Sequence, residues 1–473
     1  MPERADGFQG HFSVAWRTIA KRIEKTVMKK ILYTAILSLF ALANVKAQTT
    51  LTLEECINIA LENNLSLKRA RNSSISAKAQ MVQSKMNFLP SLSAGASYNW
   101  NEGLQFDQTS GNLVNTTTLS GGGSLNASMV IFNGMSNIYN AQRANFQYQA
   151  AEETVRNTEL QTERDVVVAF LDLISTREQL KIANQTNDLY KEQLEREEKR
   201  ERAGVGNMEQ VYNFRSQIAQ QELIIVTRQN QLQSQELRLI QLLLLDPSDN
   251  YEFAGITVND AELEAELEAY ATVYDNAREF SPSLRSAELA LQASKKSYRQ
   301  SQFTWMPSLS VGASYGTGWS SNVKAQDGTV LDLSDQFRNN EYKSAGLNLN
   351  IPLFTRFQNR TQMQVSKINY LNSELTLQDT ENQLRNQVQQ AYLDLLNAKS
   401  TYAAAKESLV NLETSFEFSK TRYDNGTVDF VTYLENVNAR NVGELTLTQS
   451  KYAILIRQMV LDIYTGQFEL ANK

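Results

Sequence analysis

The sequence predicts a mainly α-helical chain that also carries four strands of a transmembrane β-barrel, built from one unit that occurs twice. Three observations support this fold class. A nine-residue segment recurs almost unchanged, at 90–98 and again at 307–315. Apolar and small polar residues alternate through both copies, which gives each strand one face for lipid and one for water. Long proline-free tracts rich in Gln, Glu, Leu, Ala and Lys follow each copy and favour unusually long helices.

Residues 1–47 are expected to be a leader extension followed by a secretory signal peptide. A basic start at Met28–Lys30 precedes an apolar middle that runs to Val45, and Ala47 is a small residue at the expected cleavage site. The apolar middle is too short for a comfortable membrane-spanning helix. A soluble helix is the less favoured alternative. No Cys follows the cleavage site, so an acylated amino terminus is not expected.

The composition argues against several classes of function. Residues 1–47 hold 8 basic and 3 acidic residues, so their removal leaves 38 basic against 49 acidic residues and a net charge of about −11. This charge argues against nucleic acid as a partner. The sole His, His11, lies in the segment expected to be removed, and the sole Cys, Cys56, lies on the apolar face of a helical pattern. We therefore expect no enzyme activity, no cofactor and no metal site.

The first repeat, residues 48–246, is expected to begin with a helix and two strands. The strand at about 90–100 places its apolar residues, from Leu92 to Trp100, on one face. The return strand at about 123–132 alternates in the same way. The segment between them, 102–123, is rich in Gly, Asn and Thr and is predicted to be a solvated outer loop.

The second repeat, residues 271–473, is expected to follow the same order. Its strands are predicted at about 307–319 and 344–354, joined by a solvated loop at 320–343. Each predicted strand has roughly the 9–11 residues that a tilted membrane strand requires. An acidic segment at 247–270 connects the repeats and is expected to form a partly ordered equatorial belt on the helices.

Aromatic residues gather in or beside the four predicted strands, which is typical of the girdle at a membrane interface. A soluble hairpin that packs its aromatic side chains on a core is the alternative. The predicted girdle consists of Tyr98, Trp100, Phe132, Trp305, Tyr315, Trp319 and Phe354.

Two helical tracts, at 136–203 and 357–423, carry the seven-residue spacing of coiled coils. In the second tract the seam consists of Val388, Leu395, Tyr402, Leu409, Phe416 and Tyr423. A helix of nearly 70 residues would extend roughly 100 Å. Each tract is expected to reverse at a tight turn, at 203–207 and 424–427, where Gly and Asn accept the left-handed conformation. Taken alone, these seams favour a simple coiled-coil scaffold. Their connection to predicted membrane strands favours a membrane protein instead.

Four strands cannot close a barrel, so the chain is expected to be an obligate oligomer. An open edge would leave backbone groups unpaired in hydrocarbon, at several kcal/mol each. A dimer would supply eight strands, whose interior side chains nearly fill the barrel, whereas a trimer would supply twelve and a usable lumen.

Several motifs occur in a fixed order along residues 48–473: the opening segment 51–61, the two Pro-Ser-Leu strand starts, and an Arg-x-x-x-Gly turn in each repeat. The segment 169–173 is echoed at 391–395, and the repeats lie about 220 residues apart. In these features the chain resembles the TolC-like outer-membrane efflux proteins. The resemblance implies a homotrimer with a 12-stranded β-barrel in the lipid of the outer membrane and a 12-helix α-barrel that crosses the periplasm.

The resemblance also implies a function and its partners. Such proteins are passive exit ducts of tripartite efflux pumps or type I secretion systems, and their hairpin tips dock onto a periplasmic adaptor that leads to an inner-membrane pump. A periplasm-spanning tether or adhesin stalk without transport is the alternative. The adaptor contacts implied here are Arg202, Gly204, Val205, Gly206, Arg422, Asn425, Gly426 and Thr427. Turns that merely end helices are the other reading of these residues.

Members of this family can close the tunnel with acidic rings six and nine places after the second turn glycine. This chain has Thr432 and Glu435 at those places, one acid fewer than the pattern. Asp429 and Glu435 are therefore expected to place negative charge near the constriction. Ordinary solvated charges on a helix face are the alternative.

Overall fold

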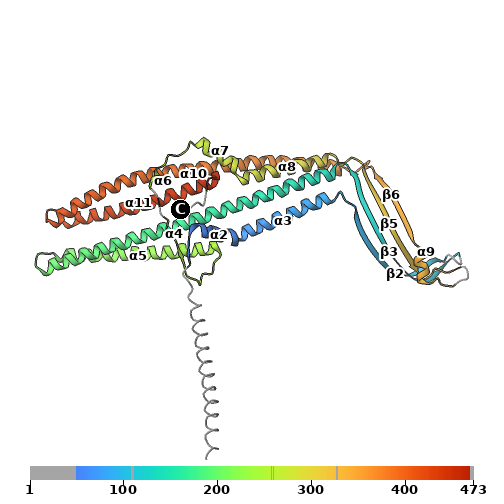
Figure 1. Cartoon of the computed structure of the whole chain (residues 1–473), viewed down its shortest axis with the longest axis horizontal. Coiled ribbons are helices and arrows are strands. Elements are labelled where there is room, and N and C mark those ends of the chain that lie inside the picture. The colour runs from blue at the N-terminus through green and yellow to red at the C-terminus, as the bar shows by residue number, and fades with distance from the viewer. Residues whose placement is uncertain (1–48, 108–110, 257, 259, 326–328, 469–473) are drawn as a thin grey trace, which may run out of the picture. The chain divides into compact units, whose positions relative to one another are not determined.

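The computed structural model describes residues 49–107, 111–256, 258, 260–325 and 329–468. The predicted leader and signal peptide, residues 1–47, lie outside these ranges. The chain divides into two units, and Figure 1 labels the helices and strands that they contain. Of the described residues, the smaller unit holds 49–52 and 246–255, and the larger unit holds the rest.

The smaller unit is a two-stranded parallel sheet. Strand β1 (Thr49–Leu51) pairs with β4 (Tyr251–Phe253), so that Leu51 lies opposite Phe253. The amide of Ala254 adds a hydrogen bond of 2.9 Å to the carbonyl oxygen of Leu51. The pairing brings the start of the first repeat to the segment that connects the two repeats.

The larger unit contains the long helices, and these show the duplication directly. The first repeat contributes α2 (Leu53–Asn63), α3 (Leu65–Met86), α4 (Ser136–Arg202) and α5 (Met208–Leu243). The second repeat contributes α7 (Tyr270–Phe280), α8 (Pro282–Gln302), α10 (Gln358–Asp424) and α11 (Phe430–Thr465). Both α4 and α10 have 67 residues, and both α5 and α11 have 36.

Caps explain where the shorter helices begin. The side chain of Asn64 accepts hydrogen bonds from the amides of Ser66 and Leu67, which separates α2 from α3. In the second repeat Ser281 caps α8, and Pro282 occupies its first turn, where a missing N–H costs nothing. Two short helices, α6 (Asp260–Glu264) and α9 (Leu333–Asn339), lie in the connections.

The coiled-coil seam predicted for the second long tract is confirmed as a buried stripe on α10. Val388 and Leu395 are fully buried, and every later seam residue to Tyr423 is less than a tenth exposed. In α4 the corresponding stripe contains Asn187, which is buried with its side-chain oxygen unpartnered. None of the helices in the described part of the chain is both long and apolar enough to cross a membrane.

Four antiparallel strands form one sheet in the order β2-β3-β5-β6. They are β2 (Ser91–Asp107), β3 (Asn112–Asn133), β5 (Ser308–Ser320) and β6 (Tyr342–Asn350). Pro90 and Pro307 directly precede β2 and β5, where a residue without an N–H can begin a strand. Among the described residues, the outer edges of β2 and β6 have no partner strand.

Three sequence predictions about this sheet are wrong. Most of the loop predicted at 102–123 is strand, because the β-branched run Thr116–Thr118 continues the ladder and glycine permits close approach. A Cβ at Gly122 would lie 2.6 Å from the carbonyl oxygen of Thr317. The last strand stops at Asn350 rather than at 354, shortly before Pro352. The loop predicted at 320–343 contains α9.

The two faces of the sheet differ in chemistry, and both are largely uncovered. One face carries large apolar side chains, such as Leu92, Trp100 and Leu347, each more than 60% exposed. The other face carries Ser, Gly and Asn in the same registers. The alternative of a soluble hairpin that buries its aromatic side chains therefore does not describe this sheet.

Candidate functional site

The first hairpin tip, between α4 and α5, is a compact turn. Gly204 adopts a φ of 75°, and the amide of Val205 donates to the carbonyl oxygen of Arg200 at 3.1 Å. A Cβ at Gly206 would lie 2.4 Å from the backbone nitrogen of Glu201, so the chain passes the helix end too closely for a side chain. Asn207 then caps α5 through the amide of Glu209.

The second tip, between α10 and α11, has the same turn with different side chains. Gly426 adopts a φ of 68°, and the amide of Thr427 donates to the carbonyl oxygen of Arg422 at 2.8 Å. The carboxylate of Asp429 caps α11 and accepts hydrogen bonds from the amide and the hydroxyl of Thr432. These hydrogen bonds lower the pKa of Asp429.

The residues predicted for adaptor docking lie together within these two turns. Val205 is 71% exposed, and all the others are exposed except Gly206, which is half-buried. Arg202 reaches back to the carbonyl oxygen of Glu198. The two Arg-x-x-x-Gly motifs are not structurally equivalent. In the first motif the left-handed glycine is Gly204, two residues before the final glycine, whereas in the second it is the final glycine itself, Gly426.

A cluster of aromatic side chains joins the two hairpins just behind the tips. Its buried members are Tyr190, Phe214, Phe416, Tyr423, Phe430, Tyr433 and Val437. The rings of Tyr423 and Tyr433 stack with centroids 4.6 Å apart and planes within 6°. Phe214 meets Phe430 edge to face at 4.9 Å. Because such pairs favour specific geometries, this aromatic cluster fixes one hairpin against the other.

A carboxylate is buried at the edge of the aromatic cluster. The side chain of Glu197 is fully buried, and its Oε1 accepts the hydroxyl proton of Tyr423 at 3.0 Å. Arg200 lies 3.5 Å from the same oxygen, whereas Oε2 has no partner. Burial, and then Glu197, raise the pKa of Tyr423, and burial raises the pKa of Tyr433 to about 12. Both tyrosines are therefore neutral at physiological pH, and of the two only Tyr423 makes a side-chain hydrogen bond, because the buried hydroxyl of Tyr433 has no partner.

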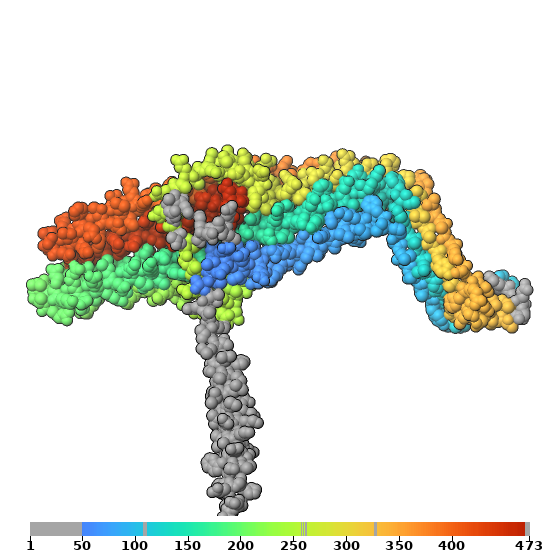
Figure 2. Space-filling view, viewed as in Figure 1, coloured from blue at the N-terminus to red at the C-terminus, as the bar shows by residue number. Residues whose placement is uncertain are grey.

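One ion pair also crosses between the hairpins. Arg196 of α4 lies 2.7 Å from Asp424 of α10, and both side chains are more than a third exposed. Together with the aromatic cluster, this pair holds the two tips at the same end of the larger unit, as Figure 2 shows.

The residues predicted for a lumen constriction occupy the first turns of α11. Asp429 and Thr432 bond to each other as the helix cap. Glu435 is exposed. Sequence reasoning treated Asp429 as a free charge and missed the cap, although Asp followed three residues later by Thr is a recognisable start of a helix.

The predicted girdle residues separate into two groups along the sheet. Tyr98 and Trp319 contact each other, with ring centroids 5.9 Å apart, and Trp100 follows in the next register. Phe132, Trp305 and Phe354 lie at the ends of the strands that meet the helices. Tyr315 lies between the groups, four residues before Trp319, and its hydroxyl donates to Glu341.

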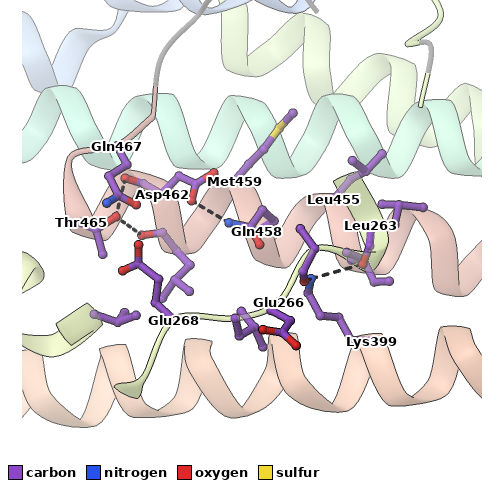
Figure 3. A pocket seen from close by; sticks show the side chains of 15 residues that line it. Leu263, Glu266, Glu268, Lys399, Leu455, Gln458, Met459, Asp462, Thr465 and Gln467 are labelled. Carbon is purple, nitrogen blue, oxygen red and sulfur yellow. Dashed lines mark hydrogen bonds between the residues drawn. The ribbon is translucent and has the colours of Figure 1, made fainter. Parts of the chain in front are cut away.

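Residues 263–268, at the end of the connecting segment, cover a cavity of about 340 Å³ against α10 and α11 (Figure 3). The ammonium of Lys399 donates to the carbonyl oxygens of Leu263 and Ala265, at 3.2 and 2.5 Å, and burial lowers its pKa. Inside the cavity Gln458 donates to Asp462 at 2.8 Å. These polar groups bond to one another within the chain, so residues 263–268 lie as a strap on α10 and α11, whereas a belt over the whole of 247–270 stays a prediction.

Sequence reasoning also missed the buried Glu197, because it lies in a run of charged residues that reads as solvated helix surface. Within the described ranges, no three His, Cys, Asp or Glu side chains are grouped as a metal site would require. Burial raises the pKa of Cys56 to about 12, which makes its thiol unreactive.

Comparisons with known proteins agree with this architecture. The chain is 23% identical to the cation efflux system protein CusC of Escherichia coli K12 over 87% of this chain and 85% of CusC. It is 21% identical to the outer membrane protein TolC of the same organism, over 84% of this chain and 78% of TolC. The crystal structure of CusC superposes with a TM-score of 0.74 at 21% identity, and covers 89% of this chain and 92% of that chain.

A second solved structure, the outer membrane protein VceC of Vibrio cholerae, superposes with a TM-score of 0.73 at 16% identity, over 88% of this chain and 96% of that chain. The profile of a protein family described as outer membrane efflux protein matches residues 56–243 and 273–467, most of both repeats. With its duplicated strands, long helical hairpins and this match, the chain belongs to the outer membrane efflux protein family.

Proposed function

We propose that this chain is the exit duct of a tripartite efflux or type I secretion system, and that it conducts substrates passively across the periplasm and the outer membrane. The observation that carries the proposal is the four-stranded sheet, which is uncovered on both faces and open at both edges. An apolar face of this kind is suited to lipid, and open edges require partner strands.

Three copies would complete the structure as a homotrimer. Pairing of β6 in one copy with β2 in the next would give a closed barrel of twelve strands with room for a lumen. The long helices support the same assembly, because exposed apolar side chains form a further stripe on α10, at Leu396 and Val410, apart from its buried seam. A second copy would cover this stripe and complete a periplasmic tunnel of helices.

The exposed tips are the proposed docking surface for a periplasmic adaptor, which would link the duct to an inner-membrane pump. The support is that both tips lie together at one end and present exposed side chains, Val205 above all. CusC is named for cation efflux, and another relative, from Aggregatibacter actinomycetemcomitans, for toxin and drug export. The proposal therefore concerns the type of conduit rather than one cargo.

Negative charge near the start of α11 is the proposed constriction. In a trimer, Glu435 would contribute one exposed carboxylate per copy. Asp429 contributes less, because its carboxylate already caps the helix. Cations would be favoured at such a ring and anions disfavoured.

Reconstitution tests the conduit. The full chain, purified in detergent, should run as a trimer and should give ion conductance in planar lipid bilayers. Glu435→Gln should reduce the preference for cations, whereas Glu209→Gln, an exposed acid in the first turn of α5, should leave that preference unchanged. A trimer that inserts but never conducts would favour a structural tether instead.

Capture of a co-expressed adaptor tests the docking surface. Val205→Glu should weaken capture of a co-expressed adaptor while leaving the trimer and its conductance intact. Val330→Glu is the matched control, because Val330 is also exposed, at 59%, but lies in the connection between β5 and β6. Equal losses in both variants would count against docking at the tips.

A further inference from the structure

Strands β2 and β3 continue well beyond the rest of the sheet. The last pair between β3 and β5 is Ser120 with Ser320, whereas β3 continues to pair with β2 as far as Asn112. We call this extension, residues 100–107 and 112–119, the β2–β3 arm. Apart from its base, where Leu119 and Ser321 exchange hydrogen bonds of 2.8 and 3.0 Å, the arm is a two-stranded ribbon.

One face of the arm carries exposed apolar side chains, together with the polar residues Glu102, Asn115 and Thr117. Leu104, Phe106 and Leu113 are 67%, 63% and 62% exposed, and Phe106 lies directly opposite Leu113. Because side chains alternate along a strand, these residues lie on the same face as Leu92 and Trp100. The face proposed to meet lipid therefore continues into the arm, with Glu102 and Thr117 placed between Trp100 and the apolar residues farther out, as suits a layer where headgroups meet acyl chains.

The other face of the arm is tied to the neighbouring connection. The hydroxyl of Thr118 donates to Gln105 at 2.5 Å, and Asn322 donates to Thr118 at 2.5 Å. Thr118 is only 8% exposed. These hydrogen bonds fix which face looks outward, so that the apolar face remains the free one.

A two-stranded ribbon with exposed apolar side chains requires a partner that shields those side chains from water. An isolated two-stranded hairpin is at best marginally stable in water, and exposed strands in water are usually protected by Lys or Pro. The arm contains neither Lys, Arg nor Pro, and its only charged residues are Glu102 and Asp107. Its bare apolar side chains would remain costly to expose, at roughly 25 cal/mol per Å².

We propose that the apolar face of the β2–β3 arm binds the interfacial layer of the outer leaflet, where acyl chains meet headgroups. The inference rests on the proposed function, since it extends the membrane face of the sheet. Continuity of that face with Leu92 and Trp100 favours lipid over a second copy or another protein.

A bend makes this contact geometrically reasonable. An upright arm would carry Phe106 about 14 Å above Trp100 at a tilt of 45°, beyond a headgroup layer of about 5–7 Å. Gly103 lies between them with a φ of 143°, a conformation that side chains rarely allow, and no atom lies near its missing Cβ. The β2–β3 ladder passes Gly103 without a register shift, so we place at this glycine the bend that contact with lipid requires.

The test places one environment-sensitive fluorophore at a time on the full chain, in a Cys56→Ala background, and reconstitutes it in phosphatidylcholine vesicles with brominated acyl chains. Leu113→Cys reports the apolar face of the arm, and Phe106→Cys repeats the measurement. Thr116→Cys lies on the opposite face of the same ribbon and is the matched control. Leu347→Cys, 71% exposed on β6, reports the membrane face of the sheet itself.

Labels at Leu113 and Phe106 should lose fluorescence about twofold or more in brominated lipid, as expected for an apolar face buried about 5–10 Å into the interface. The label at Thr116 should not. Quenching at Leu347 without quenching at either arm position would overturn this inference and leave the proposed function standing. No quenching at Leu347 would contradict the proposed function as well. A blue-shifted but unquenched label at Leu113 would mean that protein, rather than lipid, covers the arm.

Discussion

The two hairpin tips share one backbone plan but differ in what holds them together. Gly204 and Gly426 occupy the same turn position, 222 residues apart, and both hairpins have arms of identical length. In this alignment Tyr433 of the second hairpin corresponds to Val211 of the first, and Val428 to Gly206. The second hairpin supplies five of the seven buried members of this cluster, whereas the first supplies two, Tyr190 and Phe214. Duplication kept the helix lengths and let the packing roles diverge.

The largest effect should follow from removing the centre of the aromatic cluster. Tyr433→Ala should lower the free energy of local unfolding at the tips by about 3–5 kcal/mol, because it removes a buried ring. Val211→Ala, at the equivalent place, should cost about 1–2 kcal/mol. Hydrogen exchange of both tips in detergent measures the two losses. Equal losses would contradict the asymmetry between the hairpins.

The next largest loss of stability should come from crowding of the backbone at Gly206. Gly206→Ala should destabilise the first tip by about 1–3 kcal/mol, because the new Cβ meets the backbone of Glu201. Val428→Ala, at the matching position of the second tip, should cost less, since a side chain is already accommodated there. Urea unfolding of the hairpins compares the variants. A harmless Gly206→Ala would show that the first turn can relax.

High pH should loosen the aromatic cluster. Burial raises the pKa of Tyr433 from 10.0 to about 12 and also raises that of Tyr423. As pH rises, the unfolded chain therefore loses the phenol protons of these tyrosines before the folded chain does. The stability that the two buried neutral phenols contribute is fully present below pH 10 and is lost as pH rises toward 12 and beyond. The urea midpoint should fall over this range, and the fall should be smaller in Tyr433→Phe. An unchanged pH dependence in that variant would show that Tyr433 is not the titrating group.

The ion pair between the hairpins should matter least. Asp424→Asn should cost at most about 1 kcal/mol, because both partners are partly exposed. A double-mutant cycle with Arg196→Gln isolates the pair, and added salt should reduce the coupling energy. The pair of Arg215 with Glu198, within the first hairpin, is the control. A coupling above 2 kcal/mol would mean that the pair is shielded from water.

The helices could be predicted from the sequence because their signals are local. The seam from Val388 to Tyr423 and the turn at 424–427 predicted the carboxyl-terminal half of α10 and its end, and the structure confirms both. The opening strand residues after Pro90 and Pro307 were equally clear.

The rest depended on tertiary contacts that no short pattern reports. Gly121–Gly123 looked like a loop, yet these glycines permit close strand pairing. Glu197 looked solvated, but the neighbouring hairpin buries it. The two glycines of the first turn could not be told apart by sequence: Gly204 adopts the left-handed φ, whereas Gly206 is required by the close passage of the helix end.

The polar face of the sheet has a consequence for permeation. Successive registers pair Ser97 with Gly122 and Gly318, then Gly95 with Ser124, Gly316 and Tyr342, so apart from Tyr342 this part of the face holds short, uncharged groups. A conduit lined in this way would present solutes with a smooth, electrically neutral throat that neither filters nor detains them. Discrimination between cargoes would then be made upstream, before a molecule reaches the membrane.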